Sequence, residues 1–205
     1  MDRGRTHSPL MKTILTRRSL RQYRPDPVPR DLIDAVLTAA IWAPSAHNRQ
    51  PWRFAVIESD AYKRKLARAM GAKLRRDLEV DHIAKAAIEA DIARSYERIT
   101  LAPVLILLSL SMADMDSYPD EQRSQNEYMM TVQSVAMAGQ NLMLAAHDAG
   151  LGTCWMCAPL FSPEIVRVTL KLPDDWQPQG LITLGYPAQT REKTRHPQEE
   201  RTVWR

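Results

Sequence analysis

Apolar positions recur along the chain with two different spacings, which predict both helices and strands. In residues 32–41 apolar side chains return every three or four positions, as on a helix with one buried face. Residues 103–111 instead form a short apolar run that fits a buried strand. The same reasoning predicts further helices at about 8–17, 60–76, 82–100 and 124–148, and further strands at 53–58, 153–157 and 181–186. Helices and strands mix without regular alternation, which favours an α+β fold over a doubly wound parallel sheet.

Local signals place several element boundaries. Ser8 followed by Pro9 is a typical helix start. Pro44 ends the second helix, and Gly150 closes the longest helix as its C-cap. That longest helix, at 124–148, is apolar on more than one face, which predicts burial at the centre of the molecule or at a dimer interface.

Length and composition predict one domain that does not enter a membrane. The chain has 205 residues, which we divide into a mobile leader at 1–10 and a single domain at 11–205. No apolar run approaches ~20 residues and the N-terminus lacks an apolar signal core, so we expect a cytoplasmic protein. Residues 112–120 form a polar loop that could border an active site, and the tail from residue 188 is expected to run as an arm.

Two polar blocks carry the candidate chemistry. Residues 17–24, RRSLRQYR, hold four guanidiniums and a hydroxyl that could bind a phosphate. Residues 43–54 contain Ser45, Asn48 and Gln50, whose side chains could hydrogen-bond to the edge of a planar heterocycle. Together they suggest a nucleotide-like cofactor with one phosphate. Taken alone, the first block is explained equally well as a solvated basic helix end, and the second is explained better as an ordinary turn. The net charge of +4 suits nucleic acid as well as a phosphorylated cofactor.

The pair Cys154 and Cys157 allows a redox dithiol or half a zinc site. A zinc site needs four ligands, and no second pair or H-x-x-x-H motif is present. The segment is predicted to be extended, where residues three apart point to opposite faces, which disfavours a dithiol. Gly150-x-Gly152 lacks the third glycine of a dinucleotide fingerprint, and the histidines show no ligand spacing, so no metal site is predicted.

Five blocks in order give the chain a family resemblance: RRSLR, PSAHNRQPW, GLGTCWMCAP, LPDDWQPQGLITLGYP and KTRHP. The chain resembles the nitroreductase family of FMN-dependent oxidoreductases. The resemblance implies a mixed, mostly antiparallel sheet surrounded by helices, in an intertwined homodimer with flavin sites shared across the interface. It also implies that FMN is reduced by NAD(P)H, and that no side chain needs to act as a nucleophile.

The resemblance assigns cofactor contacts by position. The phosphate and ribityl chain would be held by Arg17, Arg18, Ser19 and Arg21, with Lys193 and Arg195 closing over the phosphate. The turn at Pro44, Ser45, Ala46 and Asn48 would reach the partner's flavin, and His47 within it could touch the substrate. The backbone of Trp155, Met156, Cys157 and Ala158 would lie along the flavin, with an N–H near Cys157 facing N5. The family usually has glycine or glutamate at the position of Cys157 and glycine at that of Ala158.

The implied reaction is ping-pong hydride transfer from NAD(P)H to a small-molecule acceptor such as a nitroaromatic or quinone. One alternative is a dedicated reductase in deazaflavin coenzyme biosynthesis, because the C-terminal half is also similar to the flavin domain of the deazaflavin-coenzyme glutamate ligase. A remote alternative is a basic nucleic-acid-binding module. It would need aromatic residues interleaved with the basic ones, and Tyr23 and Trp52 do not make that pattern, so we expect no nucleic-acid partner.

Overall fold

The centre of the molecule is strand β2 (Val104–Leu110), in which every residue is buried. The computed structural model describes residues 7–205. Strand β2 pairs with β1 (Trp52–Ile57) on one side and with β4 (Gln177–Gly185) on the other, and β3 (Gly152–Met156) completes the order β1-β2-β4-β3. All three strand pairs are antiparallel. The predicted α+β class and mostly antiparallel sheet are confirmed.

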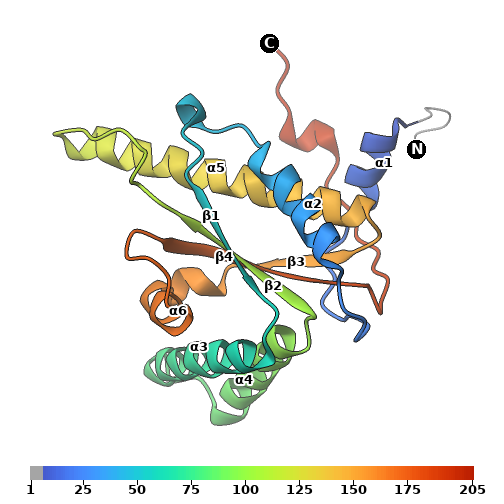
Figure 1. Ribbon diagram of the computed structural model, residues 1–205, viewed down its shortest axis with the longest axis vertical. Helices are drawn as coiled ribbons and strands as arrows, with labels where there is room; N and C mark the ends of the chain where they lie inside the picture. Colours follow the sequence, from blue (N-terminus) through green and yellow to red (C-terminus); the bar gives the residue numbers. More distant parts are fainter. Residues whose placement is uncertain (1–6) are drawn as a thin grey trace.

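Helices cover both faces of this sheet, so the molecule has three layers (Figure 1). One face carries α2 (Arg30–Ile41) and α5 (Glu121–Asp148). The opposite face carries α3 (Asp60–Val80), α4 (Lys85–Thr100) and α6 (Pro163–Leu170). The remaining helical segments are α1 (Pro9–Thr16) and three short 3-10 turns, η1 (Ala46–Asn48), η2 (Ala158–Phe161) and η3 (Gln198–Arg201).

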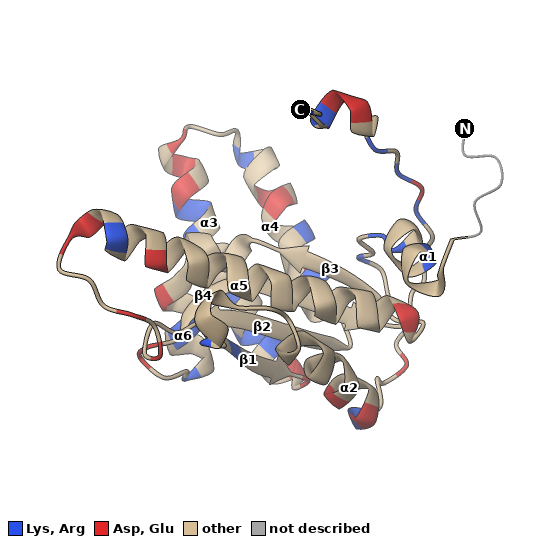
Figure 2. Cartoon of the chain, turned by 90° about the horizontal axis from the view of Figure 1, so that it is seen from above, with Lys and Arg blue, Asp and Glu red and all other residues tan. Residues whose placement is uncertain are grey.

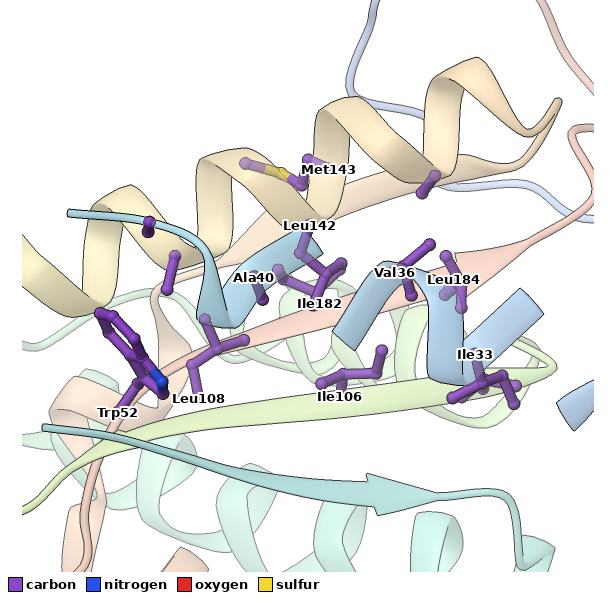
Figure 3. Packing of buried hydrophobic residues seen from close by; sticks show 14 of the residues in the cluster. Ile33, Val36, Ala40, Trp52, Ile106, Leu108, Leu142, Met143, Ile182 and Leu184 are labelled. Carbon is purple, nitrogen blue, oxygen red and sulfur yellow. The ribbon is translucent and has the colours of Figure 1, made fainter. Parts of the chain in front are cut away.

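Alternation along β2 divides the core into two halves. Ile106 and Leu108 face the cluster formed with α2 and α5, where Ala40, Leu142 and Ile182 pack against them (Figure 3). Leu105 and Leu107 point the other way, into the cluster built with α3, α4 and α6. A strand that is buried on both faces needs this continuous run of apolar residues, which is why the sequence revealed it clearly.

Helix ends follow the expected capping chemistry. The Ser8 side chain accepts a hydrogen bond from the Met11 backbone N–H at 3.3 Å, and Pro9 takes the first helical position. The helix predicted from residue 124 begins at Glu121, because the Asp120 side chain accepts from the Arg123 N–H at 2.9 Å and caps it there. Its other end lies at Asp148 as predicted, followed by Gly150 with a φ of +78°.

Two elements differ from the sequence prediction. Strand β4 begins at Gln177 rather than at 181, because pairing with β2 continues through Gln177 and Pro178 even though these residues lack strand-like apolar alternation. Helix α6 was not predicted, since its eight residues give too short a periodic pattern. It ends at Lys171 in the left-handed conformation.

The two ends of the chain lie beside each other at the β3 edge of the sheet. Residues 1–6 of the expected leader lie outside the described residues, and residues 9 and 10 already belong to α1. From Ala188 onward the chain is irregular apart from η3, as the sequence predicted, and it extends past α1 (Figure 1). Within residues 7–205, no helix has both the length and the apolarity needed to cross a bilayer.

Candidate functional site

The arginine block lies along the free edge of β3. Ser19 forms a parallel bridge with Thr153, and the Leu20 N–H donates to the Thr153 carbonyl at 2.9 Å. Further along, the Arg24 N–H donates to the Tyr186 carbonyl at 2.8 Å. The block is therefore fixed to the sheet by backbone bonds, and the Tyr23 hydroxyl adds a side-chain contact with Thr183 Oγ1 at 2.6 Å.

Of the four guanidiniums in this block, only that of Arg24 has a carboxylate partner among the described residues, Asp26 at 3.3 Å. Nη1 of Arg17 and Nε of Arg18 are buried without a hydrogen-bond partner, and among the described residues no carboxylate pairs with Arg17, Arg18 or Arg21. Burial lowers the pKa of Arg17, and the positive charges of Arg195 and Arg18 lower it further. Buried N–H donors without acceptors reduce the stability of the fold. Phosphate oxygens could accept from these donors, so the donor set fits a phosphate.

The C-terminal segment joins this cluster. The Ala188 N–H donates to the Gln22 carbonyl at 3.0 Å, and a cavity of about 310 Å³ opens between the arginine block, the end of α5 and this segment. Arg18, His147 and Arg191 are among the residues that line the cavity. Figure 2 shows basic residues along the segment as it leaves the sheet. Both residues of the predicted pair, Lys193 and Arg195, are exposed, and Arg195 lies close enough to Arg17 to lower the pKa of Arg17.

The cluster also contains Arg98 and Arg191, which the sequence analysis did not single out. Arg98 on α4 lies near Arg21 and Arg191, and burial together with these charges lowers the pKa of Arg98. A single arginine in a charged amphipathic helix gives no sequence signal. Only the three-dimensional meeting of α4 with the N-terminal block reveals it.

The turn before β1 is conformationally strained. His47, Asn48 and Gln50 have φ angles of 49°, 55° and 52°, which residues other than glycine seldom adopt. The Gln50 N–H donates to Ser45 Oγ at 3.0 Å, which fixes the turn from within. Such strain persists only where the surroundings impose it, and it is concentrated at functional sites.

The polar loop at 112–120 holds this turn from outside. Arg49 forms an ion pair with Asp116, and Arg53 donates to Asp114 at 2.7 Å. Beneath them, Glu127 on α5 is buried and accepts from the Asp116 N–H at 3.2 Å. The loop therefore borders the turn that could bind a planar heterocycle. Five charged side chains of the loop, the turn, β1 and α5 hold the turn in position.

Within one chain the turn and the arginine block are separated. The turn leads into β1, at one edge of the sheet, whereas the arginine block lies beyond β3, at the other edge. The Ala46 N–H donates to Ser134 Oγ at 3.3 Å, which fastens the turn to α5 on the sheet face that α5 covers. The structure therefore brings together Arg17, Arg18, Ser19, Arg21 and Arg195, but it leaves Pro44, Ser45, Ala46 and Asn48 at a second location.

The end of β3 forms a third part of the site. The Trp155 ring fits against two glycines, Gly139 of α5 and Gly180 of β4, where an added Cβ would overlap it. Met156 is half-buried, Cys157 is exposed after the strand, and Ala158 begins η2. The backbone of these residues is therefore positioned by the packing of the half-buried Trp155 ring.

The two cysteines are free and differ in environment. Cys154 is buried and Cys157 is exposed, as expected for residues three apart on an extended segment. Burial raises the pKa of Cys154 despite the neighbouring guanidiniums of Arg21, Arg98 and Arg17. Among the described residues, no group of three or more His, Cys, Asp or Glu side chains could hold a metal ion.

Comparison with known proteins shows which family the chain belongs to. The family model "Nitroreductase family" matches residues 14–186. An NADH dehydrogenase from Thermus thermophilus is 32% identical, over 93% of this chain and 93% of that protein. A 5,6-dimethylbenzimidazole synthase from Rhodospirillum rubrum is 28% identical, over 92% of this chain and 85% of that protein.

The chain is also similar to solved structures of flavoproteins. A Desulfovibrio desulfuricans protein, assigned as a nitroreductase and solved in complex with FMN, is 26% identical with a TM-score of 0.74, covering 98% of both chains. A BluB-like flavoprotein from Clostridium difficile has a TM-score of 0.83 at 22% identity and covers 97% of this chain and 99% of that chain, a likeness of fold alone. With a family model that spans most of the sequence and relatives that match more than nine-tenths of its length, this chain belongs to the nitroreductase family.

Proposed function

We propose that the protein is an FMN-dependent oxidoreductase that takes hydride from NAD(P)H and passes it to a small conjugated acceptor such as a nitroaromatic or a quinone. The observation that carries the proposal is the cluster of unpaired, partly buried guanidiniums beside β3. Family membership supports it, as does the FMN complex of a relative with the same fold. A cytoplasmic location is part of the same proposal.

The bound flavin would supply the redox chemistry, and the chain would supply binding and orientation. Arg17, Arg18, Ser19 and Arg21 would hold the phosphate and the ribityl chain, and Lys193 and Arg195 would approach it from the C-terminal segment. Backbone N–H groups near Met156 and Cys157 would face the N5 edge. Arg17 is our candidate for stabilising negative charge near N1 and O2.

We further propose a homodimer in which each flavin site is shared. The turn with Pro44, Ser45, Ala46 and Asn48 lies at the opposite sheet edge from the arginine block, so a second chain would be needed to bring both to one flavin. Large apolar side chains support an interface, since Trp42 is 80% exposed and Met129 on α5 is 56% exposed. The strained turn would meet the flavin edge with Ser45 and Asn48 already in position.

Cofactor release tests the proposal. Heating the purified protein should release a flavin that runs as FMN in chromatography. NADH or NADPH added under anaerobic conditions should then bleach the visible flavin absorbance, and a quinone or nitroaromatic should restore it. Release of FAD, or no flavin uptake on reconstitution, would contradict the proposal.

The acceptor needs a separate experiment. A relative named as a 5,6-dimethylbenzimidazole synthase shows that chains of this kind are associated with more than one reaction. A screen of acceptors against the reduced protein should show turnover with several quinones and nitroaromatics. Turnover confined to a deazaflavin precursor would instead favour the biosynthetic reductase.

A further inference from the structure

Arg98 lies on the side of the cluster that faces α4. The register of the sheet places Cys154 opposite Thr183, and Thr183 opposite Leu105. Side chains of directly opposed residues point to the same face, and Leu105 belongs to the core cluster on the α4 side. The buried thiol of Cys154 therefore points toward the layer that contains Arg98.

Three separate segments bring arginines to this thiol. Arg21 comes from the N-terminal block, Arg98 from α4 and Arg191 from the C-terminal segment, and all three act electrostatically on Cys154. The positive charges of Arg21 and Arg191 in turn lower the pKa of Arg98. Within residues 7–205 none of the three is paired with a carboxylate.

The other arginine of α4 behaves differently. Arg94, one turn earlier on the same helix, forms an ion pair with Asp91. On the neighbouring helix Arg75 is likewise paired, with Glu89. The α3–α4 pair thus neutralises these arginines locally but leaves Arg98 partly buried beside like charges. Like charges gathered in this way repel one another, and a bound anion would relieve that repulsion.

We propose that Arg98 is a direct contact of the cofactor phosphate and closes its site from the α4 side together with Arg21 and Arg191. The ligand chemistry is a phosphate monoester dianion, which two or more guanidiniums can bind in bidentate fashion. Taking that phosphate to belong to FMN rests on the proposed function. The inference of an anion site rests only on the arginines that gather on the Cys154 side of the sheet and on their lack of carboxylate partners among the described residues.

Comparison of FMN with riboflavin isolates the phosphate. Apoprotein would be titrated with each ligand by flavin fluorescence, for wild type, Arg98→Gln and the matched control Arg94→Gln. Loss of one charge-assisted contact should weaken FMN binding about tenfold or more in Arg98→Gln, with riboflavin binding unchanged. Arg94→Gln should match wild type for both ligands. An unchanged FMN affinity in Arg98→Gln would overturn the proposal.

Thermal unfolding of the apoprotein gives a second readout without flavin. Removal of Arg98 relieves like-charge repulsion, so the Tm of apo Arg98→Gln should equal or exceed that of wild type. Inorganic phosphate should raise the Tm of wild type and of Arg94→Gln more than that of Arg98→Gln. If wild type fails to bind FMN while phosphate still stabilises it through Arg98, the flavin function is wrong and the anion site stands. No stabilisation of wild type by FMN or by phosphate would overturn both.

Discussion

The arginine side chains at the β3 edge are held in place at an electrostatic cost. Nη1 of Arg17 is buried without a partner, and the pKa of Arg17 is lowered by burial and by Arg195 and Arg18. On a solvated basic face each guanidinium would turn toward water. The burial of these guanidiniums without partners therefore favours an anion-binding site. The sequence revealed the block because its four arginines lie within eight residues of one another. It did not reveal Arg98, which is isolated in its helix.

His147, at the end of α5, lies close to Arg17 and Arg18 of the same cluster. Its Nε2 lies 2.9 Å from Thr16 Oγ1, and its pKa is lowered, first by burial and then by Arg17 and Arg18, against the opposing effect of Asp148. The neutral imidazole is therefore the form that the folded protein favours. Below its ordinary pKa of about 6.5, the unfolded chain takes up the proton more readily than the folded protein.

The apoprotein should consequently lose stability as the pH falls below about 6.5, and His147 should contribute part of that loss. Replacing it in His147→Gln removes this contribution, so the free energy of unfolding should depend less steeply on pH in the variant. Urea unfolding of both proteins across this range measures the difference. Identical pH profiles would mean that burial and the charges of Arg17 and Arg18 do not lower the pKa of His147.

Among the elements, strand β3 and helix α5 are joined by one tight contact. The Trp155 ring packs where Gly139 and Gly180 leave no side chain, and α5 can approach the sheet closely there. The elements themselves were largely predictable, because β2 and the helices have strong apolar periodicity. The start of β4 and helix α6 were not, since their pairing and packing come from neighbours rather than from local pattern.

Gly139→Ala should test this contact. The new methyl group would overlap the Trp155 ring, and forcing extra volume into a packed site typically costs about 1–3 kcal/mol. Gly71→Ala on α3 is the matched control, because its Cβ would lie 3.4 Å from Ile92 and a helical alanine gains up to about 1 kcal/mol over glycine. Denaturant unfolding should show a loss for the first and none for the second. Equal stability of the two variants would show that α5 can move away from β3 freely.

At the scale of the whole molecule, the proposed flavin contacts form two groups at opposite edges of one sheet. The arginine block lies beyond β3 and the strained turn leads into β1. Sequence motifs identified both groups, but spacing along the chain does not say whether they meet within one chain. Only the strand order separates them, and this separation is the physical reason for proposing a site built by two chains.

Mixed dimers test that claim most directly. An Arg17→Ala chain and an Asn48→Ala chain, each expected to bind FMN poorly alone, would be co-expressed with different tags and the heterodimer isolated. If sites are shared, one site carries both defects and the other carries neither, so the heterodimer should regain about one FMN site of wild-type affinity per dimer, where the wild type has two. If each site is built within one chain, both sites keep one defect. Absence of any tight site in the heterodimer would contradict the shared arrangement.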